Sequence, residues 1–367
     1  MAHIGEAIKM MMIILQLVTS LGINVESTEI DGFKEQIYTV KASLNEHMSL
    51  TQQLAKNQVY GFETVVDMSK ISFQENSVDK AENYYDIAVN GAFYSELGRP
   101  AGIMIIDKEI VTKDRIATPM FIIRDNGDMD FVKPFVSTYF LLNDQRFYIS
   151  NINKGLSAGE LNIYTKWNGT NNRIRQTHTA IVVEKGKVTS IETGNSPFSI
   201  LGNNVSLLTN DFMICYKNIN FDMPIQIGDT ISYHMESNFD VESVKEGFQT
   251  GGWLVKDGIN IVKDYESFLG PTNSLQPRTA IGITSDNKII IKVVDGRDKG
   301  ISEGVTGYQL ANLLIEDGCI QAAYLDGGAS STFVQNGHLL NKPSLGEPKG
   351  VAHGLFFERD YQKVVAK

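Results

Sequence analysis

The chain has 367 residues, which is enough for one large domain or two ordinary ones, and either would bury a substantial core. Its 33 basic and 43 acidic side chains give a formal net charge of −10, and lysine and arginine do not cluster in the way that follows a nucleic-acid backbone. We therefore expect no nucleic-acid partner, and an anionic substrate would need positive charge gathered locally at its site.

The first element along the chain is an apolar stretch from Lys9 to Val18, for which three interpretations are open. It is too short to span a bilayer, which takes about 20 apolar residues, so we expect no membrane span. As a secretion signal it has a weakly charged start, because Glu6 offsets Lys9. A helix that packs on its own domain is the second alternative.

The third interpretation is a helix over residues 1–24 that joins copies of the chain through residues 4–21. Apolar residues recur there at alternating intervals of three and four, which is the spacing of a coiled-coil seam, and they are Ile4, Ala7, Met11, Ile14, Val18 and Leu21. We favour this oligomerising helix over the other two interpretations.

Residues 25–367 are expected to form one domain of the α+β class, rich in strands and hairpins, with a few helices. Turn sequences recur there between runs rich in valine, isoleucine and aromatic residues, which is the sequence form of a β-hairpin. The clearest four hairpins are FIIRDNGDMDFV (121–132), TAIVVEKGKVTSI (179–191), GGWLVKDGINIV (251–262) and AIGITSDNKIIIKVV (280–294).

Helices are predicted at three places in this domain. The strongest runs from Thr306 to Asp317, because Thr306 and Gln309 have the spacing of a capping box, three leucines share one face, and Gly318 follows as the expected stop. Two shorter helices are expected over Leu50 to Lys56 and Thr64 to Lys70.

The two cysteines, Cys215 and Cys319, lie in apolar sequence and are predicted to be buried free thiols. The histidines lack ligand spacing, so we expect no zinc site and no cofactor. The acidic turn 125–130 could hold calcium, but it lacks the full loop pattern and the closing glutamate.

The most informative stretch is QAAYLDGGASSTF, residues 321–333. An apolar strand ends there at Asp326, which is followed by two glycines that permit close backbone approach and by three hydroxyl side chains. A strand that ends in a carboxylate is a rigid mount of the kind that catalysis needs. Asp-Gly-Gly is also a common turn, so the tripeptide alone decides nothing.

Four other motifs accompany this stretch: NGAFY (90–94), PRTAIGI (277–283), VVDGR (293–297) and PKGVAHGLFF (348–357). In this order and spacing, the chain from Ile37 to Phe357 resembles the phosphodiester glycosidase family, whose best-known member removes N-acetylglucosamine from a sugar phosphodiester. The chain departs from the family pattern at five positions: Ala92 and Ala329 stand where glycines are common, Tyr94 where a phenylalanine is usual, Lys349 where an arginine is typical, and His353 where an asparagine is common.

The resemblance implies a set of catalytic and substrate-binding residues. Asp326 is the leading catalytic carboxylate, Arg278 is the leading phosphate ligand, and Asp295 is a reserve carboxylate that reads equally well as part of a strand-end turn. The implied substrate-binding residues are Asn90, Gly91, Gly251, Gly252, Thr279, Gly327, Gly328, Ser330, Ser331, Thr332, Lys349 and His353. A carboxylate suits the oxocarbenium-like state at an anomeric carbon, and cations suit a leaving phosphate.

The function expected from the resemblance is hydrolysis of a sugar-1-phosphodiester, in a bacterial cell-surface glycopolymer such as teichoic acid. The alternative is a non-catalytic glycan-binding protein or a structural protein of a phage particle, because Lys349 and Ala329 are departures within the site. The low cysteine count favours a bacterial or phage source, and with it an extracellular or virion-associated place of action.

Overall fold

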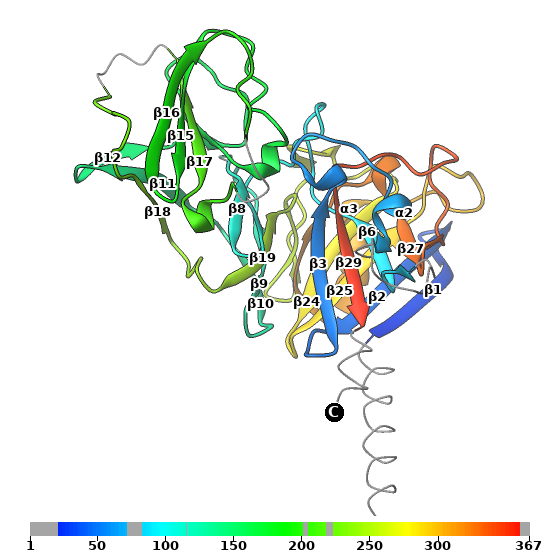
Figure 1. The fold of residues 1–367 in the computed structure, drawn as a ribbon. Helices are drawn as coiled ribbons and strands as arrows, with labels where there is room; N and C mark the ends of the chain where they lie inside the picture. Colours follow the sequence, from blue (N-terminus) through cyan, green and yellow to red (C-terminus); the bar gives the residue numbers. More distant parts are fainter. Residues whose placement is uncertain (1–20, 72–82, 115, 201–204, 218–222, 360–367) are drawn as a thin grey trace, which may run out of the picture.

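The computed structural model describes residues 21–71, 83–114, 116–200, 205–217 and 223–359. These residues form two lobes that Figure 1 shows side by side. The larger lobe, on the right, contains the N-terminal and C-terminal strands, and the smaller lobe, on the left, is built from the middle of the chain. The prediction of a strand-rich fold with several hairpins and few helices is confirmed for the described residues.

The larger lobe is centred on a seven-stranded antiparallel sheet. Every residue of β24 is buried, so this strand is covered on both of its faces. In spatial order the strands are β1 (Leu21–Ile30), β2 (Phe33–Ser43), β25 (Lys288–Val294), β24 (Arg278–Thr284), β26 (Cys319–Tyr324), β20 (Trp253–Lys256) and β21 (Ile259–Asn260).

A five-stranded sheet covers one face of this central sheet, and helix α3 (Gly307–Glu316) covers the other. Ile281 and Leu355 belong to the core between the two sheets, whereas Tyr324 and Leu310 belong to the core beneath the helix. The strands of the second sheet are, in order, β28 (His338–Leu339), β27 (Phe333–Gln335), β6 (Ile87–Asn90), β29 (His353–Arg359) and β3 (Met48–Leu54).

A third sheet connects the two lobes. Its strands contribute Phe121 and Phe248 to the core of the larger lobe and Ile122 and Val244 to the core of the smaller one. The strand order is β10 (Met129–Val132), β9 (Met120–Arg124), β19 (Val244–Gln249), β7 (Met104–Ile106) and β8 (Glu109–Thr112).

The smaller lobe contains two further sheets. One has the order β12 (Gln145–Tyr148), β11 (Val136–Leu142) and β18 (Ser232–Ser237), and the other has the order β13 (Asn151–Ile152), β14 (Leu161–Tyr164), β17 (Phe212–Tyr216), β15 (His178–Glu184) and β16 (Lys187–Gly194). Short pieces complete the described chain: β4 (Lys70–Ile71) with β5 (Asn83–Tyr84), β22 (Tyr265–Glu266) with β23 (Gly270–Pro271), and the 3₁₀ turns η1 (Ala55–Asn57), η2 (Lys166–Asn168), η3 (Leu207–Thr209) and η4 (Gly328–Ser330).

The four predicted hairpins are confirmed as the strand pairs β9–β10, β15–β16, β20–β21 and β24–β25. The predicted helix at 306–317 is confirmed as α3, and both hydrogen bonds of the capping box between Thr306 and Gln309 are present. Cys215 and Cys319 are buried free thiols, as predicted, and burial raises the pKa of each to about 12.

Two helix predictions need correction. Residues 50–56 were expected to be helical, but Met48–Leu54 is strand β3, in which buried and more exposed positions alternate with a period of two. The helix expected over Thr64 to Lys70 is a single turn, α2 (Val65–Met68), capped by the Thr64 hydroxyl.

The predicted helix over 1–24 falls mostly outside the described residues, so oligomerisation through residues 4–21 stays a prediction. Its last four residues, 21–24, belong to strand β1 instead. They pair with β2 because Asp31 and Gly32, both with positive φ, make the tight turn that a hairpin requires. No helix among the described residues has the length and apolar character needed to cross a membrane.

Candidate functional site

Asp326 lies where the two sheets of the larger lobe meet. It follows β26 directly, its backbone N–H donates to the carbonyl of Gly91 (3.0 Å), and the N–H of Leu325 donates to the carbonyl of Thr279 (2.9 Å). The end of β26 is therefore fixed to the ends of β6 and β24 at once. The carboxylate at this junction is mounted on three strands rather than on a free loop.

The Asp326 carboxylate accepts hydrogen bonds from the Ser330 hydroxyl and from the Gly327 N–H. Burial raises the pKa of this carboxyl above its ordinary value, while these two donors and the nearby Lys349 charge oppose the shift. The φ of Gly328 is +61°, which allows the chain to turn back so that Ser330 faces Asp326. The glycines thus build the pocket in which the carboxylate sits.

Asn90 holds the Asp326 loop from behind. Its side-chain amide donates to the Asp326 carbonyl (2.5 Å), and its Oδ1 accepts from the Thr279 hydroxyl and the Thr332 N–H, both at 3.0 Å. Ser331 Oγ lies 3.2 Å from the Thr279 hydroxyl. These four predicted substrate-binding residues are buried and bonded to one another, so they position the loop.

Arg278 is a buried cation, only 3% exposed, at the start of β24. Its guanidinium donates to the carbonyls of Val305 (3.3 Å) and Ser274 (3.2 Å) and lies over the ring of Tyr324. Burial lowers its pKa, but an arginine stays charged. Among the described residues it has no carboxylate partner, although a buried charge normally requires one.

Arg297 is the second cation at this place, and the sequence analysis did not select it. Its side chain contacts Gly328, since a Cβ built there would lie 3.2 Å from Nη2, and Nε donates to Gln276 (2.8 Å). Arg297 is the last residue of the VVDGR motif, from which only Asp295 was predicted as a site residue. The family resemblance had assigned Arg297 no function.

One pocket of about 530 Å³ brings these groups together. Arg278, Arg297 and Asp326 line it along with the backbone of Gly327 and Gly328, and the remaining lining residues are Phe268, Leu269, Pro271, Ser274, Gln276 and Ala329. A carboxylate and two arginines facing one space can hold a ligand that carries both a developing positive charge and a phosphate.

Lys349 and Tyr94 both lie close to Ser330, the residue that faces the Asp326 carboxylate. Lys349 Nζ lies 3.5 Å from Ser330 Oγ and 5.3 Å from the centre of the Tyr94 ring, and the Tyr94 hydroxyl lies 3.2 Å from the same Oγ. Lys349 is exposed, so its ammonium group is free to reach a bound ligand. Tyr94 was part of the NGAFY motif but was not predicted as a site residue.

Asp295 does not line this pocket. Its carboxylate accepts from the Asn341 side chain and from the Lys342 N–H, both at 2.9 Å, and burial raises its pKa. Asn341 in turn donates to the Ser331 carbonyl and accepts from the Phe333 N–H. This arrangement favours the strand-end interpretation, in which Asp295 supports the hydroxyl-rich segment.

His353 is fully buried at the start of β29. Its Nδ1 accepts from the Ala92 N–H (2.9 Å), so Nε2 carries the proton and donates to Gln52 Oε1 (3.1 Å). Burial lowers its pKa to about 3, which keeps the ring neutral. Of the remaining predicted residues, Gly251 packs against Phe93 and Tyr324, and Gly252 packs against Glu266.

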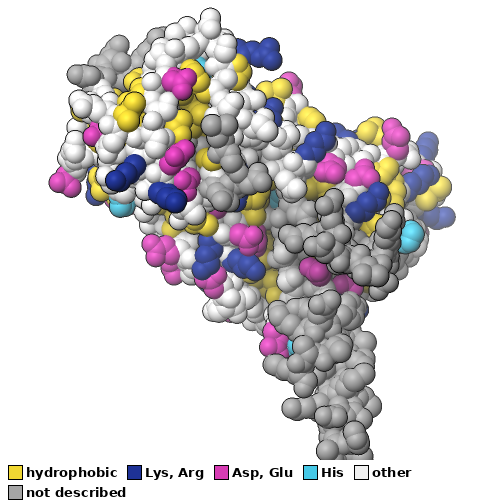
Figure 2. Space-filling model, in the orientation of Figure 1, with side chains coloured by type: hydrophobic (Ala, Val, Ile, Leu, Met, Phe, Trp, Pro, Cys, Tyr) yellow, Lys and Arg dark blue, Asp and Glu magenta, His cyan; other side chains and the backbone are white. Residues whose placement is uncertain are grey.

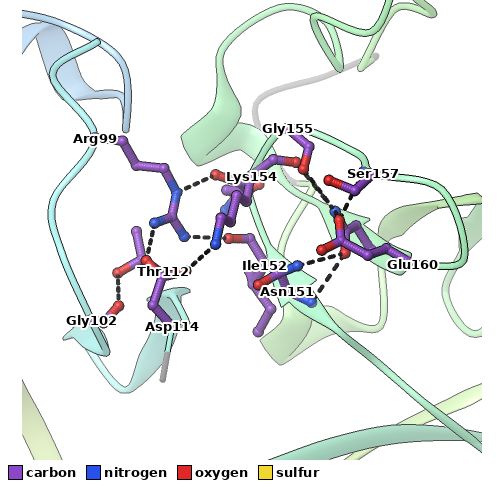
Figure 3. Close-up of polar contacts among 12 residues, drawn as sticks. Arg99, Gly102, Thr112, Asp114, Asn151, Ile152, Lys154, Gly155, Ser157 and Glu160 are labelled. Carbon is purple, nitrogen blue, oxygen red and sulfur yellow. Dashed lines mark hydrogen bonds and ion pairs between the residues drawn. The ribbon is translucent and has the colours of Figure 1, made fainter. Parts of the chain in front are cut away.

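A second, larger pocket of about 830 Å³ lies next to the first. Figure 3 shows part of its wall, where the side chains of Arg99 and Lys154 both point toward Asp114. Phe268 lines both pockets, and Tyr94 lines the second. The sequence analysis predicted none of these residues except through the motif that contains Tyr94.

Residues 177–358 match the model of a family described as phosphodiester glycosidase, and the chain belongs to that family. It is 36% identical over 114 residues to a protein described as SPbeta prophage-derived uncharacterized protein YomE, from Bacillus subtilis (strain 168). That match covers 31% of this chain and 17% of the relative.

Two further similarities were found. Over 103 residues, the chain is 29% identical to the N-acetylglucosamine-1-phosphodiester alpha-N-acetylglucosaminidase of Bos taurus, which covers 25% of this chain and 19% of that protein. The matched regions thus span a fifth or less of the length of these curated relatives. The crystal structure of a hypothetical protein from Synechocystis has the same fold, with a TM-score of 0.75 and 17% identity over 93% of this chain and 62% of that one.

Proposed function

We propose that the protein hydrolyses the bond between the anomeric carbon of a sugar and a phosphodiester. The observation that carries this proposal is that Arg278, a buried cation with no carboxylate partner in the described part of the chain, shares a pocket with Arg297 and Asp326. A phosphate would supply the negative charge that Arg278 lacks, and bidentate hydrogen bonds suit a guanidinium and a phosphate. Membership in the phosphodiester glycosidase family supports the same reaction.

Each group has a role in this reaction. The bond from the anomeric carbon to the phosphate oxygen breaks, both electrons leave with the phosphate, and water supplies the new hydroxyl group on the carbon. Asp326 faces the carbon and stabilises its positive charge, as nucleophile or as charge partner. Arg278 and Arg297 hold the departing phosphate, whose charge rises as the bond breaks.

Ser330 and Lys349 assist the carboxylate. The Ser330 hydroxyl and the Gly327 N–H bond to the ionised form of Asp326, and the Lys349 charge favours that form as well. These groups offset part of the effect of burial, which favours the neutral acid and leaves the pKa of Asp326 above its ordinary value. A carboxylate that is ionised before the substrate binds is what the oxocarbenium-like state requires.

The setting we propose is a bacterial cell surface, with a sugar-phosphate polymer such as teichoic acid as substrate and a phage particle or prophage as the source. Similarity to a prophage-derived protein supports this setting. In the alternative function, the pocket binds a glycan without cleaving it. Lys349 favours that alternative, because its point charge replaces the planar fork of the arginine that is typical there.

The test is release of free reducing sugar from UDP-N-acetylglucosamine and from teichoic-acid fragments. Asp326→Asn is expected to keep the fold and lose at least about a thousandfold in kcat. Asp257→Asn is the matched control, because it makes the same change in an exposed turn whose φ of +54° asparagine tolerates. Glycan binding without release by the unaltered protein would replace the hydrolase with the binding function.

A further inference from the structure

The second pocket carries an excess of positive charge. Its lining includes Arg99, Lys154, Arg173 and Arg175, and among the described residues Asp114 is the one acidic side chain that lines it. The chain as a whole has a net charge of −10, and basic and acidic side chains are interspersed over the face shown in Figure 2. Such a local excess against an acidic background attracts an anionic ligand.

Asp114 accounts for only part of this charge. It pairs with Arg99 and, at 2.8 Å, with Lys154, so one carboxylate is shared by two cations. Arg99 is buried and also donates to the carbonyls of Ile152 (3.1 Å) and Asn153 (2.9 Å), which fixes it in the wall. Lys154 is 43% exposed and lines the pocket, and its positive charge is only partly neutralised because Asp114 is shared with Arg99.

The other two cations have no acidic partner among the described residues. Arg173 donates to the Asn168 carbonyl (3.1 Å) and to Gln58 (3.2 Å) and lies over the ring of Tyr60, so every one of its contacts is uncharged. Arg175 is exposed and makes no hydrogen bond or ion pair within the described part of the chain. Both guanidinium groups are therefore available to an anion.

The two pockets have a common wall. Phe268 lines both, and it is stacked on Phe93 with ring centres 4.8 Å apart. Tyr94 lines the second pocket and reaches Ser330, which hydrogen-bonds Asp326. A ligand that passes Tyr94 would therefore touch Arg278 and Arg297 at one end and the cations of the second pocket at the other.

We propose that the second pocket is an anion subsite that holds a neighbouring phosphate of the same glycan chain. The protein would then recognise a polymer of sugars joined by phosphodiesters, with one phosphate at Arg278 and Arg297 and another at Lys154, Arg173 and Arg175. The ring of Tyr60 or Tyr94 provides an apolar face for the sugar between them. This inference rests on the proposed hydrolysis at Asp326, and it adds a second phosphate site through which the protein recognises the neighbouring repeat of the polymer.

The test combines Arg173→Gln with Arg175→Gln and measures kcat/KM for a teichoic acid whose repeats are N-acetylglucosamine 1-phosphate, joined by phosphodiesters at the anomeric carbon, and for UDP-N-acetylglucosamine. The ratio of the two values, polymer over single sugar, is expected to fall about tenfold or more, because two phosphate contacts are lost. Arg146→Gln combined with Lys187→Gln is the control, since it removes two exposed charges outside both pockets. An unchanged ratio in the first variant overturns the subsite.

A binding measurement separates failure of the subsite from failure of the proposed reaction. Calorimetric titration of the Asp326→Asn protein with the same teichoic acid is expected to show binding that weakens with salt, and that weakens further when Arg175→Gln is added. If the unaltered protein cleaves neither substrate, the proposed reaction fails, but loss of binding in the arginine variants still supports the subsite. If the arginine variants and the control variant bind the polymer with equal affinity, the proposed anion subsite is overturned.

Discussion

The imidazole of His353 occupies the space that a side chain on Gly91 would need. A Cβ built on Gly91 would lie 2.1 Å from Nδ1 of His353, far closer than two such atoms can approach. The ring is held there by the Ala92 N–H on one side and by Gln52 on the other. Because the Gly91 carbonyl accepts from the N–H of Asp326, this contact bears directly on the Asp326 loop.

Gly91→Ala is expected to destabilise the protein by about 1–3 kcal/mol, because the buried ring has no room to move. The same change should lower kcat, since it shifts the carbonyl that anchors Asp326. Thermal unfolding and sugar release measure the two effects. Gly22→Ala is a suitable control, because its Cβ would meet no atom closer than 3.6 Å. Equal unfolding temperatures for the two variants would show that His353 does not constrain Gly91.

Arg278→Lys and Arg297→Gln are each expected to raise KM and lower kcat together. The phosphate carries more charge in the transition state than in the bound substrate. Loss of a guanidinium contact therefore weakens stabilisation of the transition state more than it weakens substrate binding. We expect kcat/KM to fall about a hundredfold in Arg278→Lys and by a smaller factor in Arg297→Gln, because Arg297 is exposed. A change in KM alone would reduce Arg278 to a residue that merely binds substrate.

Asp295→Asn distinguishes a supporting carboxylate from a catalytic one. The Asp295 carboxylate accepts two hydrogen bonds at 2.9 Å, and an amide can accept only on its oxygen. We expect a loss of stability of about 1–3 kcal/mol with kcat reduced less than about tenfold. A loss of turnover equal to that of Asp326→Asn, at unchanged stability, would instead make Asp295 catalytic.

Glu246 is expected to make stability depend on pH. It is buried and bonded to Gln52 (2.8 Å), and burial raises its pKa from 4.5 to about 7. Because the folded state favours the protonated acid, its contribution is fully present below pH 4.5 and is lost as pH rises through about 7. The loss amounts to about 3 kcal/mol at most.

Urea unfolding between pH 5 and 8 measures this dependence. Glu246→Gln should flatten the curve, whereas Glu242→Gln, a change on an exposed neighbour, should leave it as it is. A slope that survives in Glu246→Gln would assign the dependence to another group.

The elements that the sequence predicted correctly are those whose signals are local. The α3 helix carries its own capping box, and the four hairpins carry their own turns between apolar runs. Residues 50–56 were misassigned because seven residues are too few to separate a period of two from a helical period, and their strand pairing depends on β29, some 300 positions away.

The candidate site was predictable only in part, for the same reason. Asp326 and Arg278 stood out through the family motifs, and they share a pocket. The burial of Asn90 and His353 and the participation of Arg297 and Phe268 depend on packing between distant segments. No periodicity or spacing in the sequence carries that information. The second pocket is invisible to sequence reasoning because its cations come from three separate places along the chain, near residues 99, 154 and 173–175.

Strand β6 has a consequence for any attempt to isolate the part of this protein that matches the family. It lies between β27 and β29 in the five-stranded sheet, and it delivers Asn90 and the Gly91 carbonyl to Asp326. The segment that matches the family, residues 177–358, contains β27 and all but the last residue of β29, but it does not contain β6. A fragment cut to that segment would leave β27 and β29 each without its partner β6, and its Asp326 loop would keep its contacts to β24 but lose those to Asn90 and Gly91.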